Sequence, residues 1–242
     1  MPAPARCRRR IGTATGCPGW GDAIRKPRAL PRFYSALLGQ FGPQHWWPGD
    51  TAFEIIVGAI LTQSTAWINV EKAITNLKRE GALTVGGMEA LPEAALAALI
   101  RPSGYFRQKA RKLKAFLAYL RRRHGGSLRR MFRTGTPELR RELLAVWGIG
   151  EETADSILLY AGGRATFVVD AYTRRILDRH GLAPASASYH HIQALMERVL
   201  PPRAPIYNEF HALLVQAGKR HCLRRRPRCA GCPLENFPHR AE

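Results

Sequence analysis

The chain has 242 residues, of which 45% are hydrophobic, and this suits one domain or two small domains that share a cleft. Its 38 Lys and Arg residues against 18 Asp and Glu give a formal net charge of +20, which favours a polyanionic partner, above all nucleic acid. No segment approaches the ~20 apolar residues of a membrane span, and the basic residues are scattered instead of forming one amphipathic stripe, so a membrane partner is disfavoured. A merely solvated basic surface is the remaining alternative.

The N-terminal segment, residues 1–30, alternates Arg, Pro, Gly and small residues without an apolar central stretch. This composition predicts a disordered basic segment and not a signal peptide. We therefore expect a cytoplasmic protein, associated with the nucleoid if its source is bacterial.

From about Leu30 onward the apolar residues recur with helical spacing, and Asn-Gly hairpin turns are absent. The sequence therefore predicts an all-α fold. The expected helices are two within 51–79, then 91–100, 109–123, 137–146, 153–160, 171–180, 190–200 and 206–221.

A tight turn, Gly148-Ile149-Gly150, separates two of the expected helices. Glycine adopts backbone angles closed to other residues and lets a phosphate approach the backbone N–H groups, and the dipole of the second helix assists at its N-terminus. Such a hairpin grips one DNA strand without reading its bases. An ordinary corner between two helices is the alternative.

Several motifs together resemble one family. They are Leu61-Thr-Gln63, Gly104-Tyr-Phe-Arg-Gln-Lys109-Ala110, Trp147-Gly-Ile-Gly-x-x-Thr-Ala154, Val168-Val-Asp170 and a cysteine-containing tail. Their order and spacing over roughly residues 31–232 resemble the endonuclease III superfamily of helix-hairpin-helix DNA glycosylases. The resemblance implies a two-lobed fold: a six-helix lobe over 45–164, and a second helical lobe that combines 31–44 with 165–242. It also implies that the partner is double-stranded DNA with a damaged base in the cleft, and we expect a monomer.

The resemblance assigns two acidic residues. Asp170 matches the catalytic aspartate of the superfamily, where a carboxylate can stabilise the charge developing on the sugar and orient the attacking water. Because Asp170 precedes an expected helix, an N-cap role is the alternative, and the two roles can coexist. Glu152 stands where the strand-cutting members have their nucleophilic lysine, and a carboxylate cannot form a Schiff base. The sequence therefore predicts a glycosylase without lyase activity.

Aromatic residues favour one branch of the superfamily. A base alkylated at a purine nitrogen carries positive charge, leaves readily and suits an electron-rich aromatic pocket. Trp46, Trp47, Pro48 and Trp67 resemble the pocket of the endonuclease III-like 3-methyladenine DNA glycosylases, which also have a glutamate at the position of Glu152. The tryptophans could instead be core filler. Rival functions are a mismatch-specific adenine or thymine glycosylase and a lesion-binding protein without activity.

A flipped nucleotide leaves a gap in the duplex that side chains must fill. The resemblance places Gln63 opposite the orphaned base and Tyr105 as a wedge between stacked bases. Lys109 would lie among the basic residues that neutralise phosphates, although each of these could be an ordinary loop or surface residue.

Cys222, Cys229 and Cys232 have C-x6-C-x2-C spacing, which resembles the first three ligands of the endonuclease III [4Fe–4S] cluster. The fourth cysteine would stand at Pro238, and His239 follows it. We expect a cluster with a different fourth ligand, zinc bound with a histidine, or a decayed site.

Overall fold

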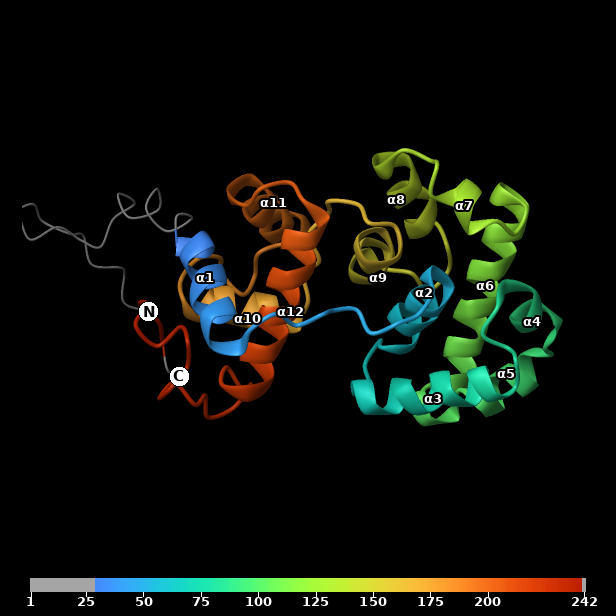
Figure 1. Cartoon of the computed structure of the whole chain (residues 1–242), viewed down its shortest axis with the longest axis horizontal. Helices are drawn as coiled ribbons and strands as arrows, with labels where there is room; N and C mark the ends of the chain where they lie inside the picture. The colour runs from blue at the N-terminus through green and yellow to red at the C-terminus, as the bar shows by residue number, and fades with distance from the viewer. Residues whose placement is uncertain (1–28, 241–242) are drawn as a thin grey trace, which may run out of the picture.

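The structure is a computed structural model that describes residues 29–240. These residues form helices joined by loops and contain no β-strand, which confirms the all-α prediction (Figure 1). The expectation of disorder for residues 1–28 lies outside the described residues, and its boundary is two residues too late because α1 begins at Ala29. Within 29–240 no helix is long and apolar enough to cross a membrane.

One hydrophobic core is enclosed by helices α2 to α9. Their bounds are α2 Ala52–Leu61, α3 Trp67–Arg79, α4 Val85–Ala90, α5 Glu93–Leu99, the 3-10 turn η3 Arg101–Ser103, α6 Phe106–His124, α7 Leu128–Met131, α8 Thr136–Leu144 and α9 Glu151–Ser156. Ile56, Leu77, Phe116 and Leu143 lie at its centre and are at most 1% exposed. Helix α2 starts at Ala52 because the Thr51 hydroxyl accepts the N–H of Glu54.

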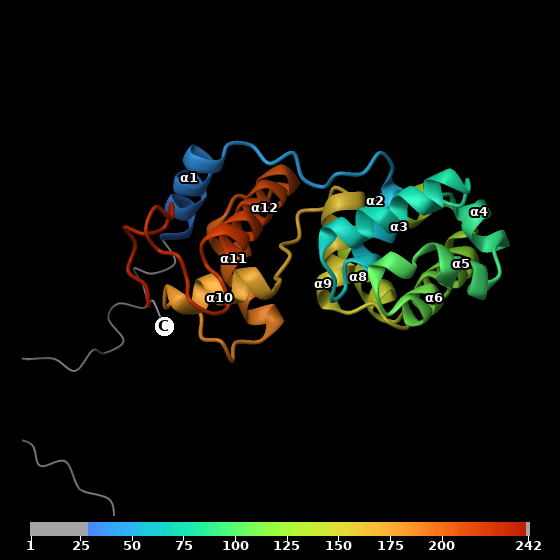
Figure 2. The same cartoon turned by 90° about the horizontal axis from the view of Figure 1, so that it is seen from below.

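A second core lies under helices α1, α10, α11 and α12. Their bounds are α1 Ala29–Phe41, α10 Ala171–Arg179, α11 Tyr189–Val199 and α12 Ala204–Arg220. Leu30, Phe33, Phe167 and Phe210 are at most 1% exposed in this core. Figures 1 and 2 show α1 lying against α12, although the two helices are far apart in the sequence.

The chain passes between the two lobes twice, through residues 42–51 and through residues 162–170 (Figures 1 and 2). A π-helical turn, η4 Ile157–Ala161, extends α9 just before the second passage. This turn contacts α2 of the first lobe and α12 of the second. Both passages therefore bring side chains to the space between the lobes.

The differences from the expected helices have local causes. Helices α1, α4 and α7 are not among the expected helices. Helices α4 and α7 have six and four residues, too few for a periodic apolar pattern to show. The segment expected as one helix over 153–160 instead joins α9 to the π-helical turn.

We predict that Phe33→Ala lowers the free energy of unfolding by about 3–5 kcal/mol, because it leaves a cavity where α1 meets the rest of its lobe. The Phe33 ring contacts Phe237 and His180, with centroid distances of 4.6 and 4.8 Å. Urea unfolding measures the change, and Ser35→Ala, on the exposed side of α1, should stay within about 0.5 kcal/mol of wild type. Equal stability of the two variants would show that α1 does not contribute to the core as described.

Candidate active site

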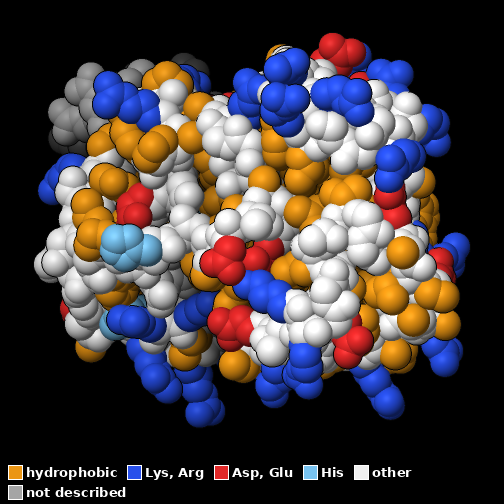
Figure 3. Space-filling model, turned by 45° about the vertical axis from the view of Figure 1, so that its right-hand side comes forward, with side chains coloured by type: hydrophobic (Ala, Val, Ile, Leu, Met, Phe, Trp, Pro, Cys, Tyr) orange, Lys and Arg blue, Asp and Glu red, His pale blue; other side chains and the backbone are white. Residues whose placement is uncertain are grey.

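A cavity of about 840 Å³ lies between the two lobes. The sequence-predicted residues that line it are Trp46, Trp47, Gln63, Trp67, Gly148, Gly150, Glu152 and Asp170. On the face drawn in Figure 3, Lys and Arg side chains gather at the upper right and along the lower edge. Residues as far apart in the sequence as Trp46 and Asp170 therefore line one cavity.

Asp170 is the last residue of the segment 162–170, which joins the two lobes, and is the N-cap of α10. Its Oδ1 accepts the N–H of Thr173 at 2.7 Å, so the capping role is confirmed. Its Oδ2 lies 3.7 Å from His211 Nε2, and the residue is 9% exposed at the cavity wall. The cap engages one carboxylate oxygen, which leaves the other for a ligand in the cavity. The catalytic role of Asp170 stays a prediction.

Three tryptophan rings form the apolar part of the cavity. The ring centroids of Trp46, Trp47 and Trp67 lie 5.1–5.8 Å apart in tilted and edge-to-face arrangements. Trp47 also packs on Tyr160 at 5.1 Å. Pro48 does not line this cavity: it is exposed and lines a neighbouring one on the far side of Trp47 and Trp67. The structure therefore separates Pro48 from the cavity that the other predicted pocket residues share.

Glu152 lies in the first turn of α9 and faces the same cavity as Asp170. Although its side chain is partly exposed, desolvation by the cavity walls raises its pKa to about 7, and the charge of Asp170 raises it further against a smaller opposing effect of Arg174. Near neutral pH the cavity therefore holds a second carboxyl group that is only partly ionised.

The hairpin turn depends on one of its two glycines. Gly148 has φ +83°, and a Cβ there would collide with the Lys112 side chain. Gly150 has φ −96°, which other residues adopt, and serves as the N-cap of α9. The Ile149 side chain is 5% exposed and belongs to the hydrophobic core, and its backbone N–H donates to Val146 O at 3.1 Å. A contact of Ile149 with DNA stays a prediction.

Gln63 is fastened to the hairpin. Its Nε2 donates to Gly148 O at 3.1 Å and to Thr153 Oγ1 at 2.9 Å, and its Oε1 accepts from Lys112. Tyr105 is 69% exposed and has φ +45° at the start of α6. Tyr105 is therefore free to enter a duplex, whereas Gln63 must exchange partners to reach an orphaned base.

Lys109 contradicts the expectation of a phosphate contact, because it is 2% exposed. Its ammonium donates to Leu61 O at 2.8 Å and to Ser103 O at 2.6 Å. These carbonyls lie two residues before Gln63 and two residues before Tyr105, so Lys109 ties together the loops that carry both. Burial, and to a lesser extent the charge of Lys112, lowers the pKa of Lys109 to about 8.

The sequence did not indicate that Tyr172, Tyr189, His211 and Lys219 line the cavity, and it placed Lys112 only among the basic residues near phosphates. His211 is 6% exposed, and burial lowers its pKa against the opposing charge of Asp170. Its Nδ1 pairs with Tyr160 Oη at 2.6 Å, while its Nε2 has no hydrogen-bond partner among the described residues. The four-residue spacing of His211, Val215 and Lys219 along one face of α12 is the sequence signal for His211 and Lys219.

The cysteines of the tail gather at a separate, small cavity. Cys222, Cys229, Cys232 and His239 line it, and Arg179 Nη1 donates to Cys222 Sγ at 3.2 Å. Pro238, at the position of the missing fourth cysteine, offers only a carbonyl, which pairs with His180 Nδ1 at 3.0 Å. Among residues 29–240 no three Cys, His, Asp or Glu side chains are placed to hold a metal ion. The donors present at this site do not make up a four-ligand cluster site.

Comparisons with known proteins identify the same family of DNA repair proteins. Residues 57–202 match the family described as HhH-GPD superfamily base excision DNA repair protein. A relative from Methanocaldococcus jannaschii, named "Putative DNA repair glycosylase MJ1434", is 44% identical over 208 residues, which are 85% of this chain and 94% of that protein. Endonuclease III of Escherichia coli is 27% identical over 188 residues, 78% of this chain and 83% of that protein.

Solved structures share the fold. The 3-methyladenine DNA glycosylase MagIII of H. pylori, bound to 1,N6-ethenoadenine, superposes with a TM-score of 0.70 at 27% identity, covering 81% of this chain and 97% of that one. Endonuclease III in a non-covalent DNA complex superposes with a TM-score of 0.75 at 22% identity, covering 88% of this chain and 94% of that one.

The buried ammonium of Lys109 gives a test of the loop geometry. Because its pKa is lower in the folded than in the unfolded chain, the unfolded chain binds more protons between about pH 8 and about pH 10.5, and folding becomes more favourable as pH rises through this range. We expect the free energy of unfolding of wild type, relative to Lys109→Met, to increase by about 1–3 kcal/mol from pH 8 to pH 10. A difference between the two proteins that does not change with pH would contradict the buried placement.

Proposed function

Because the chain belongs to the HhH-GPD superfamily of base excision DNA repair proteins, we propose that it is a monofunctional DNA glycosylase for alkylated purines of the 3-methyladenine type. Asp170 is the catalytic carboxylate of this proposal. The observation that carries it is the cavity between the lobes, which places Asp170 beside three tryptophan rings and Glu152. The likeness to MagIII supports the substrate class.

The aromatic rings of the cavity suit a positively charged base. An alkylated purine carries positive charge, and the faces of Trp46, Trp47 and Trp67 attract a cation through their quadrupoles. When the bond between C1′ and the base nitrogen breaks, its electron pair neutralises the base, which therefore leaves without needing a proton. Above about pH 7 the ionised Glu152 adds a second attraction for the charged base before it leaves.

Asp170 acts on the sugar in this proposal. Its Oδ2 is the carboxylate oxygen not used by the helix cap, and its negative charge stabilises the positive charge that develops at C1′. A water molecule then attacks C1′ and gives a proton to the carboxylate. The products are the free base and an intact strand with an abasic site.

DNA binding in this proposal depends on charge and on the hairpin. The net charge of +20 supplies the attraction, and the turn at Gly148 presents backbone to one strand at the mouth of the cavity. The exposed Tyr105 enters the duplex from the loop before α6. We propose that one chain acts alone, in the cytoplasm.

We predict that Asp170→Asn reduces the release of 3-methyladenine and 7-methylguanine from methylated DNA by at least about 100-fold, because the neutral amide loses the charge that stabilises the sugar. Asparagine still caps α10, so the melting temperature should change little. Asp178→Asn, on the same helix and hydrogen-bonded to Ala185 and Arg240, is the matched control with wild-type release. No release by wild type, or equal rates for wild type and Asp170→Asn, would refute the proposal.

The missing lyase activity is tested by borohydride trapping of a covalent adduct with abasic-site DNA. We expect no adduct with wild type and a trapped adduct with Glu152→Lys, which places an amine where strand-cutting members carry theirs. Glu138→Lys makes the same charge change on α8, where Glu138 is exposed, and should form none. A wild-type adduct would contradict the prediction and would direct attention to Lys112 and Lys219, which also line the cavity.

A further inference from the structure

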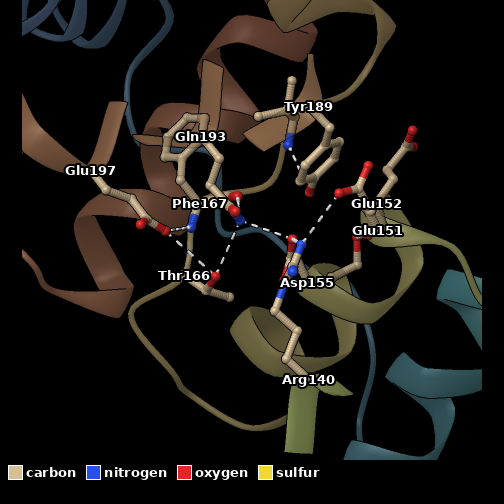
Figure 4. Close-up of polar contacts among 11 residues, drawn as sticks. Arg140, Glu151, Glu152, Asp155, Thr166, Phe167, Tyr189, Gln193 and Glu197 are labelled. Carbon is tan, nitrogen blue, oxygen red and sulfur yellow. Dashed lines mark hydrogen bonds and ion pairs between the residues drawn. The ribbon is translucent and has the colours of Figure 1, made fainter. Parts of the chain in front are cut away.

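The segment that leads to Asp170 is held by one stripe of side chains on α11. Residues 166–169 are buried, and their backbone pairs with polar side chains at four-residue spacing. Glu197 Oε1 accepts Phe167 N–H at 2.8 Å, Gln193 Nε2 donates to Phe167 O at 2.8 Å, and Tyr189 Oη accepts Val169 N–H at 3.3 Å. Figure 4 shows this arrangement. Side chains of α11 therefore supply hydrogen-bond partners to this backbone, as a neighbouring strand would in a β-sheet.

Gln193 also reaches the other lobe, through Asp155. Its Nε2 donates to Asp155 Oδ2 at 2.8 Å, and Asp155 in α9 is 0% exposed. Arg140 in α8 holds the same carboxylate with two hydrogen bonds, from Nε to Oδ1 at 2.7 Å and from Nη2 to Oδ2 at 3.0 Å (Figure 4). The contacts thus run from both hairpin helices, through Gln193, to the backbone three residues before Asp170.

The polar groups of this network are held from several sides. A buried carboxylate is costly to leave unpaired, and Arg140 neutralises the Asp155 charge with the two-pronged geometry that makes such pairs strong. Gln193 Nε2 has two hydrogens and lies near three acceptors, Asp155, Phe167 O and Thr166 Oγ1. The amide is consequently held on several sides, and so is the backbone that it contacts.

We propose that Gln193, held by the Arg140–Asp155 ion pair, is a positioning residue that fixes Asp170 relative to the DNA-gripping hairpin. This inference rests on the proposed function. When the hairpin engages the backbone, the network transmits its position to the segment that ends in Asp170. A displacement of about 1 Å at a reacting group can cost about 100-fold in rate, so the network should govern the excision step more than DNA affinity.

The test is Gln193→Met, which keeps the length of the side chain and removes its hydrogen bonds. We expect its single-turnover rate of 7-methylguanine release to fall by about 30-fold or more, while its Kd for a duplex with a tetrahydrofuran abasic analogue changes less than threefold. Met196→Ala, fully buried on the same helix, is the control for lost stability. Assayed well below its melting temperature, it should keep the wild-type excision rate.

Gln193→Glu gives a second readout that a merely structural role would not produce. Near pH 8 its carboxylate faces Asp155 and Phe167 O, which are both acceptors, and excision should be slow. Lowering the pH to about 6 protonates this buried carboxyl and restores an O–H donor, so the rate relative to wild type should rise at least about threefold.

The outcomes separate the two proposals. If wild type releases no methylated purine, the proposed function is wrong. If wild type is active and Gln193→Met excises at the same rate, or if its rate and its DNA affinity fall together, the inference is overturned. A Gln193→Glu rate that does not recover relative to wild type at low pH would overturn it too.

Discussion

The arrangement of the cavity depends on one constraint: the buried backbone of residues 166–169 must find hydrogen-bond partners without a neighbouring strand. Backbone N–H and C=O groups left unpaired in a protein interior are costly. Here side chains of α11 pair with the N–H and C=O of Phe167 and with the N–H of Val169. The next residue, Asp170, begins the following helix as its cap. The carboxylate that the proposed chemistry needs is consequently placed by hydrogen bonds on the segment before it and by a helix N-terminus after it.

The opposite side of the cleft is organised by buried or half-buried amines. Lys109 joins the loop after α2 to the loop before α6 through two carbonyls, and Lys112 joins Gln63 to the hairpin. Neither function was evident from sequence, where both lysines fit a basic surface. Because these loops are fixed before DNA arrives, the protein need not order them on binding, which lowers the entropic cost of recognition.

The sequence was sufficient for features that local pattern determines. Apolar spacing predicted the long helices from α2 onward but not α1, and the resemblance to the endonuclease III superfamily predicted that Gly148, Asp170 and the tryptophans share one cleft. Features set by the direction of a side chain could not be predicted: Pro48 lies behind Trp47 and Trp67, Ile149 points into the core, and Lys109 is buried. The sequence did not indicate Gln193 or His211, because a polar side chain on a helix is expected at the surface unless its partners on other helices are known.

We propose that this cavity accepts alkylated purines and that the chain leaves the strand intact. The most direct measurement is base release by wild type from separate duplexes that contain 7-methylguanine, a thymine–guanine mismatch, an adenine opposite 8-oxoguanine, or an oxidised pyrimidine. We expect release of the alkylated purine alone, with strand breaks appearing only after alkali treatment. Preferential release from a mismatch, or strand cleavage without alkali at an oxidised pyrimidine, would contradict it.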